Sequence, residues 1–208
     1  MAIDESGAGT VPDAAPDADT GDTRARLVAA ARDVISDVGL KRARMEDIAA
    51  RAGVSRAAVY YHFNTKGDLA AALADDVFER LTVTIRAALA DGPLDGVIAA
   101  TVHFFVDQVA VARLLITEMV LPADPLQLVA RHRAALLGLV RRRVAADMAA
   151  GAVRAMDPDV AAQAILELMR VAPVELICND AADPEHLISE LTTFLRNAIA
   201  PRPEPPRA

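Results

Sequence analysis

Four side chains, Arg56, Ala57, Tyr60 and Tyr61, have the types and the spacing needed to contact DNA. The large apolar residues at the other positions of this short predicted helix point to its inner side. All four named residues are therefore expected on its outer face. A guanidinium can bond O6 and N7 of guanine, and an alanine methyl can closely approach a thymine methyl. Phenolic hydroxyls can bond phosphate oxygens. The chemistry predicted for this face is therefore contact with double-stranded DNA.

Two short helices joined by a tight turn must position this face. Ile48 lies in the first helix, and Gly53 can adopt the left-handed conformation that turns the chain sharply. Ser55 is a natural N-cap for the second helix, in which Val59 and Phe63 point inward. The pattern predicts a helix-turn-helix, whose second helix enters the major groove.

The same run resembles the TetR family of one-component regulators over roughly residues 23–70. The matching residues are Val38-Gly39-Leu40, Asp47-Ile48-Ala49, Ala52-Gly53-Val54-Ser55, Val59-Tyr60-Tyr61-His62-Phe63, Thr65-Lys66 and Leu69. The resemblance implies an N-terminal DNA-binding domain, followed by a helical body that binds a small effector and forms a homodimer. Its expected partners are a palindromic operator in double-stranded DNA, a second copy of the chain and a small molecule.

The resemblance also implies which residues touch DNA. They are Arg56, Ala57, Tyr60, Tyr61, His62 and Lys66, with Ser55 at the start of the helix. The family often has Thr-Thr before the first helix of the motif, whereas this chain has Ala43-Arg44, and Arg44 is expected to supply the phosphate contact instead. Packing remains the alternative for the two tyrosines and for His62, and simple solvation the alternative for Arg56.

Charge is distributed unevenly along the 208 residues, whose formal net charge is −7. Residues 1–22 carry −6, residues 23–66 carry +5 and the remainder carries −6. An anionic partner is therefore expected for the basic segment alone. Within that segment, Arg24, Arg32 and Arg51 are expected to form a solvated face.

Every strong hydrophobic period between the two ends is helical, which predicts an all-α fold of about nine helices. The predicted organisation is a disordered acidic tail over 1–22, a helix-turn-helix DNA-binding domain over 23–68, a larger helical domain over 69–200 and a Pro-rich tail over 201–208. In the larger domain, helices are expected at about 67–90, 94–109, 111–121, 125–149, 157–179 and 184–199. Pro173 is expected to kink the helix that contains it.

Polar and aromatic residues embedded in the apolar helices of the body are candidates for an effector pocket. They are His103, Phe104, Thr117, Met119, Glu167 and Arg170. A satisfied core or surface position is the alternative for each. The scarcity of Trp and Tyr in the body favours an apolar or weakly acidic effector over a stacked cation.

Two apolar stripes near the C-terminus are candidates for a two-fold interface. Their residues are Ile165, Leu168, Leu187, Leu191, Phe194 and Leu195. They could equally bury a core within one chain. A dimer is expected on geometry alone, because one helix-turn-helix reads a single half-site.

Other functional classes have less support in the sequence. The single Cys178 excludes an internal disulfide framework and any cysteine-based zinc site, and no metal or cofactor is expected. No catalytic motif is recognised, so the chain is not expected to be an enzyme. Without a targeting or membrane-spanning segment, a cytoplasmic protein is expected. The alternatives are a regulator that binds DNA without an effector, and a helical small-molecule-binding protein or enzyme.

Overall fold

The computed structural model describes residues 18–39, 41–109 and 125–201, which form eight α-helices and contain no strand. The helices are α1 (Ala18–Val38), α2 (Met45–Ala52), α3 (Arg56–His62), α4 (Lys66–Asp91), α5 (Gly96–Asp107), α7 (Pro125–Ala149), α8 (Pro158–Cys178) and α9 (Pro184–Ile199). This confirms the all-α prediction. The helix expected at 111–121 lies outside the described residues.

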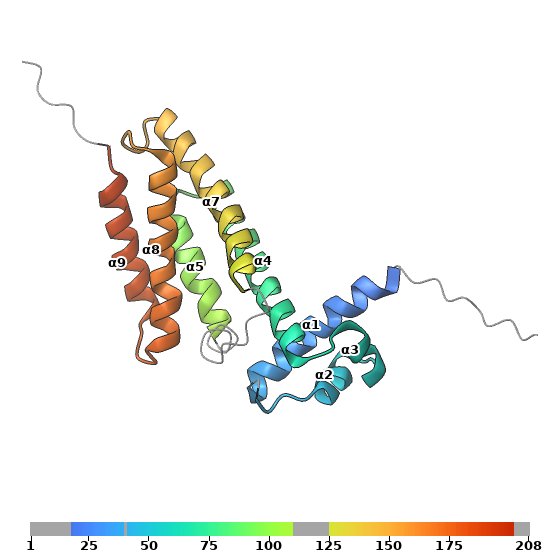
Figure 1. The fold of residues 1–208 in the computed structure, drawn as a ribbon. Helices are drawn as coiled ribbons and strands as arrows, with labels where there is room; N and C mark the ends of the chain where they lie inside the picture. Colours follow the sequence, from blue (N-terminus) through green and yellow to red (C-terminus); the bar gives the residue numbers. More distant parts are fainter. Residues whose placement is uncertain (1–17, 40, 110–124, 202–208) are drawn as a thin grey trace, which may run out of the picture.

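Helices α1, α2 and α3 form a small module at one end of α4 (Figure 1). Helix α1 begins at Ala18, ahead of the boundary expected after residue 22. It ends at Val38, and the next residue, Gly39, has a φ of 78°, in the left-handed region that favours glycine. The module buries apolar side chains from all three helices: Leu27, Ala31, Val34, Ile35, Ile48 and Val59.

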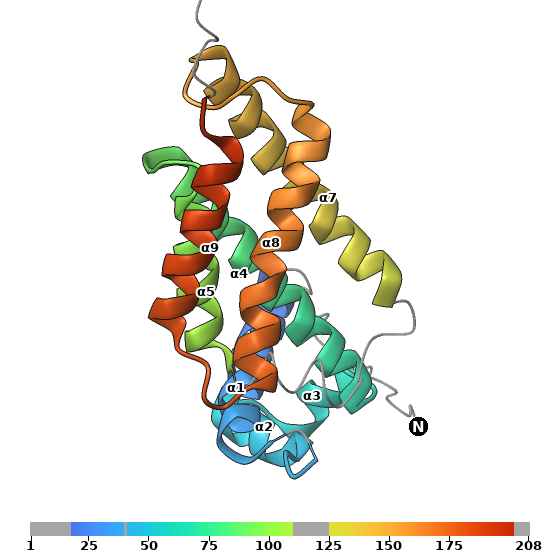
Figure 2. The same ribbon diagram turned by 90° about the vertical axis from the view of Figure 1, so that its left-hand side faces the viewer.

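Helix α4 is the longest element and runs from this module into the body (Figure 1). In the body it packs against α5 and α7, while α8 packs against α5, α7 and α9. Helices α8 and α9 lie side by side and form the face turned toward the viewer in Figure 2. No helix in the described part of the chain is long and apolar enough to cross a membrane.

Asp-Pro pairs begin both helices of that face. The Asp157 carboxylate accepts hydrogen bonds from two backbone N–H groups at the start of α8, and Asp183 does the same at the start of α9. Proline at the first helical position loses no hydrogen bond and fixes a helical φ. Helix α8 continues past the buried Pro173 to Cys178.

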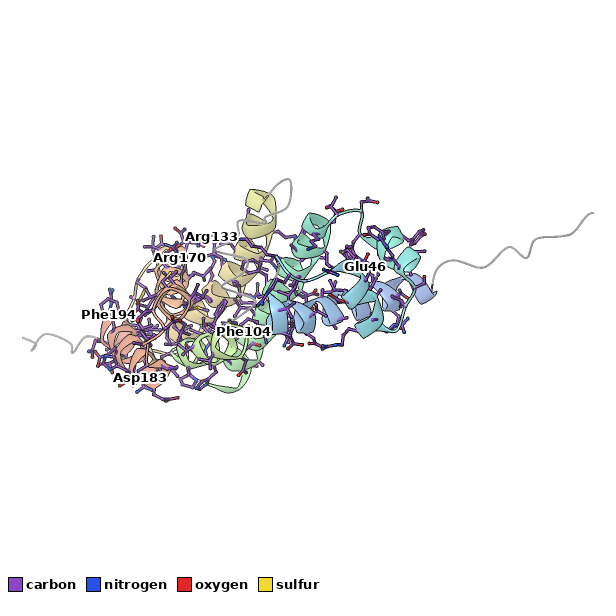
Figure 3. All side chains as sticks on the ribbon, turned by 90° about the horizontal axis from the view of Figure 1, so that it is seen from below. Glu46, Phe104, Arg133, Arg170, Asp183 and Phe194 are labelled. Carbon is purple, nitrogen blue, oxygen red and sulfur yellow. The ribbon has the colours of Figure 1, made fainter. Side chains whose placement is uncertain are left out.

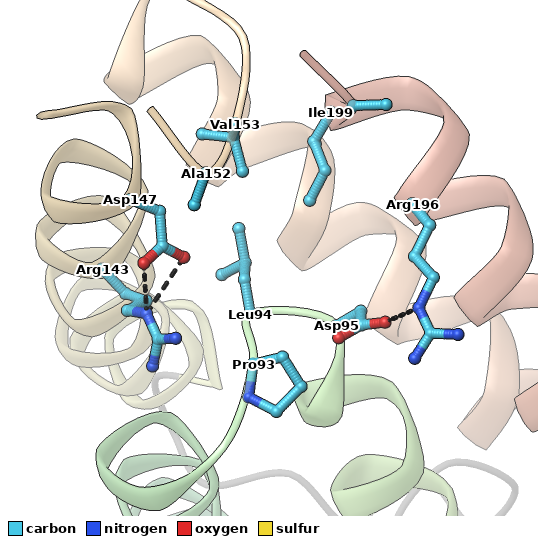
Figure 4. Close-up of a pocket in the computed structure, with 10 residues that line it drawn as sticks. Pro93, Leu94, Asp95, Arg143, Asp147, Ala152, Val153, Arg196 and Ile199 are labelled. Carbon is cyan, nitrogen blue, oxygen red and sulfur yellow. Dashed lines mark hydrogen bonds and ion pairs between the residues drawn. The ribbon is translucent and has the colours of Figure 1, made fainter. Parts of the chain in front are cut away.

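Ion pairs and hydrogen bonds connect the helices at the end of the body away from the N-terminal module, where the chain passes from α4 into α5 (Figure 4). Arg196 of α9 bonds the buried carboxylate of Asp95 at the start of α5. Arg143 of α7 bonds Asp147 at 2.8 Å and donates to the carbonyl of Leu89 at the end of α4. The hollow between these pairs measures about 290 Å³, and the charges drawn at its wall are already paired.

Candidate nucleic-acid interface

The turn between α2 and α3 has the geometry that the sequence predicts. Gly53 ends α2 with φ 67° and ψ 35°, in the left-handed region. The Ser55 hydroxyl then accepts a hydrogen bond from the N–H of Ala58 at 3.1 Å, which caps α3. An N-cap of this kind stabilises a helix by about 1 kcal/mol, a large contribution for one of only seven residues.

Helix α3 buries one face and exposes the other. Val59 is fully buried, and Phe63, which follows the helix, is 2% exposed. On the opposite face Arg56 and Ala57 are exposed, Tyr60 is 40% exposed and Tyr61 is 74% exposed. Two exposed tyrosines beside an arginine and an alanine leave this surface open to a ligand of the module.

Arg56 is held by two neighbours on this surface. Its Nη2 lies 3.1 Å from Oε1 of Glu46 in α2, and its guanidinium lies over the Tyr60 ring, 5.5 Å from the centroid. Both charged side chains of the pair are largely exposed, at 66% and 47%. Exposed pairs are weak and exchange readily with water or a stronger anion. The arginine is therefore oriented toward the outer face without being locked there.

His62 occupies a different position from its neighbours. It is half-buried, and its ring meets Tyr61 edge-on at 5.2 Å and Phe63 at 6.4 Å. Arg24 of α1 lies over the same Phe63 ring at 5.3 Å. These contacts favour the bracing role for His62 that the sequence left open.

The start of α4 lies beside α3. The Thr65 hydroxyl accepts a hydrogen bond from the Asp68 N–H and caps α4, while the Asp68 carboxylate accepts one from the Thr65 N–H, which forms a complete capping box. Lys66, exposed, is the first residue of the helix. Arg44 precedes α2 without a side-chain cap bond, so the missing hydroxyl cap is replaced by an exposed cation.

Comparison with known proteins identifies this module. The family model of the bacterial regulatory proteins of the tetR family matches residues 27–73, from the core of α1 to the first turns of α4. Over these residues the chain is similar to the TetR family.

Curated relatives match the same region of the chain. The HTH-type transcriptional regulators TtgR and CymR, both of Pseudomonas putida, are 38% identical over 74 residues and 34% identical over 91 residues. These matches cover 36% and 41% of this chain, and 35% and 45% of the relatives. The chain thus aligns with less than half the length of the curated relatives it matches.

Solved structures extend the likeness to the body. A bacterial regulatory protein of the tetR family from Rhodococcus RHA1 is 25% identical, with a TM-score of 0.62 over 86% of this chain and 97% of that one. A TetR/AcrR-family regulator from Thermobifida fusca has a TM-score of 0.69 at 19% identity, over 85% and 97% of the two chains. The fold of the TetR family therefore holds for module and body together.

Two adjacent carboxylates of α4, Asp75 and Asp76, bond helices on different sides of it. Asp76 lies 2.5 Å from Nη2 of Arg32 in α1, with both side chains less than one third exposed. Oδ1 of Asp75 lies 2.7 Å from Nε2 of His132 and 2.7 Å from Nη2 of Arg131, both residues of α7. The solvated role expected for Arg32 is wrong, because Arg32 ties α1 to α4.

The Asp75 carboxyl has a perturbed pKa. Burial alone would raise this pKa, but the hydrogen bonds from His132 and Arg131, with the charge of Arg131, outweigh burial and hold it below its ordinary value. His132 also stacks on Phe78 of α4 at 5.3 Å between centroids. Helix α4 is thus bonded to α7 of the body through Asp75 and to α1 of the N-terminal module through Asp76.

The four candidate pocket residues that the structure describes do not all line one site, although Glu167 and Arg170 are paired. His103 is exposed and lies 3.5 Å from Glu185, Phe104 is buried, and Glu167 pairs with Arg133 and Arg170 on the surface. Thr117 and Met119 lie outside the described residues. Of the four described candidates, Arg170 lines the apolar cavity between α4, α5, α7 and α8 and the other three do not. In residues 18–39, 41–109 and 125–201, no cluster of His, Cys, Asp and Glu could hold a metal ion.

The candidate interface residues divide into two groups. Ile165 and Leu195 are 3% exposed and belong to the core of the protomer itself, which corrects their expected position on the interface. Phe194 is 64% exposed, and the remaining three are half-buried: Leu168, Leu187 and Leu191. Neither Glu46 nor the Asp75–His132 pair was among the candidate residues, because their partners are distant in the sequence.

Proposed function

We propose that this protein is a transcriptional regulator that binds a palindromic DNA operator as a homodimer and is released from it by a small molecule, acting as a repressor in the cytoplasm. The exposed outer face of α3 carries this proposal. That face combines a base-reading arginine, a small residue and two phenol groups on a capped helix of a helix-turn-helix. It belongs to residues 23–66, which carry a net charge of +5.

Each exposed residue has a distinct role in this proposal. Arg56 reads guanine in the major groove, and Ala57 lets the helix approach the bases closely. Tyr60 and Tyr61 donate their hydroxyls to phosphates. Lys66 contacts a phosphate at the start of α4, where the helix dipole also favours an anion. Arg44 adds a phosphate contact from the other side of the motif, and Ser55 holds the start of α3, while His62 braces the helix from behind.

Exposed apolar residues on α8 and α9 support the dimer. Phe194 is 64% exposed and Val160 is 64% exposed, and both line an apolar groove of about 270 Å³ between the two helices. A large exposed aromatic residue beside such a groove is typical of a surface that meets another protein. A second copy placed on this face gives a four-helix interface and two recognition helices, as a palindrome requires.

Helix α4 supplies the route from the effector to DNA. It bonds α1 through Asp76 and α7 through Asp75, so a displacement of α7 relative to the module changes both contacts. In a dimer, the recognition helices must reach major grooves about 34–36 Å apart. A shift of a few ångströms in this spacing therefore lowers the affinity for the operator.

The test begins with DNA fragments retained by the purified protein, which are sequenced to obtain an operator. Fluorescence anisotropy then measures the binding of Arg56→Ala and Lys66→Ala to an operator library. Arg56→Ala is expected to relax base choice at one position by about 1–3 kcal/mol. Lys66→Ala is expected to weaken binding to all sequences equally and to reduce the salt slope by about one. A uniform loss in both variants would contradict the assigned roles.

A further inference from the structure

A cavity of about 170 Å³ lies between α4, α5, α7 and α8. Most of its wall is apolar: Phe78, Leu81, Phe105, Leu136, Leu166 and Met169. The buried hydroxyl of Thr101 also reaches the wall, but it donates its hydrogen to the carbonyl of Val97 at 2.7 Å. The apolar part of the wall thus suits a hydrocarbon group.

At one edge of the cavity, two arginines of its wall, Arg133 and Arg170, meet one carboxylate. Nη1 of Arg133 lies 2.9 Å from Oε1 of Glu167, and Nη2 of Arg170 lies 2.8 Å from Oε2 of the same residue. Figure 3 shows Arg133 and Arg170 next to each other on α7 and α8. Two cations against one anion leave one positive charge, and each guanidinium carries five N–H donors, more than Glu167 can use.

The other titratable residue that the structure describes in the cavity wall, His132, is paired with an acid. His132 forms part of the wall, stacked on Phe78, and its Nε2 bonds Asp75. Arg131 bonds the same carboxylate, so Asp75 presents no uncompensated negative charge to a ligand. The field at the open edge is therefore set by the pair of arginines and favours an anion.

We propose that this cavity binds a small monocarboxylate whose apolar body is about the size of one aromatic ring. The apolar body fills the space between the helices, and the carboxylate lies at the edge, bonded by Arg133 and Arg170 in competition with Glu167. The size follows from the volume, since a cavity of about 150 Å³ lined by apolar side chains accommodates benzene in another protein. The charge follows from the excess of one cation among the described residues Arg133, Arg170 and Glu167. This inference rests on the proposed function in taking the monocarboxylate to be the effector.

Calorimetric titration of the full-length protein tests the site without DNA. The probes are benzoate, phenylacetate and isovalerate, each compared with its neutral amide. At least one carboxylate is expected to bind about tenfold more tightly than its amide, as charge-assisted hydrogen bonds to arginine allow. If none of the three binds more tightly than its amide, the proposal is wrong.

Variants of the edge residues are expected to act in opposite directions. Arg133→Gln lowers the affinity for the carboxylate to that for the amide, while Glu167→Gln raises it several-fold because it removes the competing anion. Arg141→Gln is the matched control, because Arg141 forms an α7–α8 ion pair with Asp159 at 2.5 Å but does not line the cavity. A loss of carboxylate affinity in Glu167→Gln, or an equal loss in Arg141→Gln, would show that the arginines act only through helix packing.

The role as effector is measured separately. Adding the bound carboxylate to an operator complex reports by anisotropy whether DNA is released. Binding with the expected variant pattern supports the site whether or not DNA is released. If the protein does not bind DNA, or if the carboxylate does not release it, the proposed function is contradicted. The carboxylate-binding site is not contradicted by that result.

Discussion

Replacement of Glu46 by glutamine is expected to tighten DNA binding, although Glu46 belongs to the DNA-binding module. In the free protein, Oε1 of Glu46 lies 3.1 Å from Nη2 of Arg56 (Figure 3 labels Glu46). A bidentate contact to guanine requires the Arg56 guanidinium to leave this carboxylate. The Glu46→Gln variant removes that competition before DNA arrives.

The magnitude follows from the exposure of the pair. Both side chains are about half exposed or more, at 66% and 47%, so the pair is of the weak surface type. Such a pair contributes about 0.2–1 kcal/mol, so the two copies in a dimer contribute about 0.4–2 kcal/mol. The operator Kd is therefore expected to fall by about twofold to thirtyfold.

Fluorescence anisotropy with an operator duplex measures this change. Asp47→Asn is the matched control, because Asp47 is an exposed acid in the same first turn of α2 that has no ion pair with Arg56. In an Arg56→Ala background, Glu46→Gln is expected to gain no more than Asp47→Asn does. An equal gain in the control, or a gain that persists without Arg56, would refute the reasoning.

Three further predictions concern the body and the caps. Phe194→Glu is expected to convert the dimer to a monomer in analytical ultracentrifugation, whereas Val83→Glu, an equally exposed position on α4, leaves the dimer intact. Asp75→Asn lowers the urea midpoint at neutral pH. The pKa of Asp75 in the folded protein lies below its ordinary 3.8. The stability difference between Asp75→Asn and the original protein is therefore largest above pH 3.8 and becomes smaller as the pH falls below that value. Ser55→Ala removes the cap of α3 and lowers the free energy of unfolding by about 1 kcal/mol, measured by urea denaturation.

Local features of the DNA-binding module could be predicted from sequence because they depend on neighbouring residues. Gly53 specifies a left-handed turn, Ser55 caps the next helix, and Val59 with Phe63 selects its buried face. Each of these depends on residues within about one helical turn. Once the buried positions of α3 are assigned, the remaining positions, beginning with Arg56, are predicted to form its exposed face.

Contacts between distant helices could not be predicted in the same way. The helical period identifies an apolar stripe but not what covers it, so Ile165 and Leu195 were indistinguishable from the exposed Phe194. For polar residues next to such stripes, the sequence likewise does not show whether they are bonded to another helix or exposed to solvent. The Arg32–Asp76 pair joins residues 44 apart, and no local pattern distinguishes that arginine from a solvated one.

The order of the two carboxylates on α4 limits how this protein can be recombined with others. Asp75, nearer the N-terminus, serves the body, whereas Asp76, nearer the C-terminus, serves the DNA-binding module. A crossover before Asp75 separates Arg32 from its own acid, and one after Asp76 separates His132 from its own acid. A crossover between the two exchanges both acids at once. No single junction in α4 keeps each half with its own carboxylate, so a working hybrid must inherit compatible partners from α1 and α7 as well as the helix that joins them.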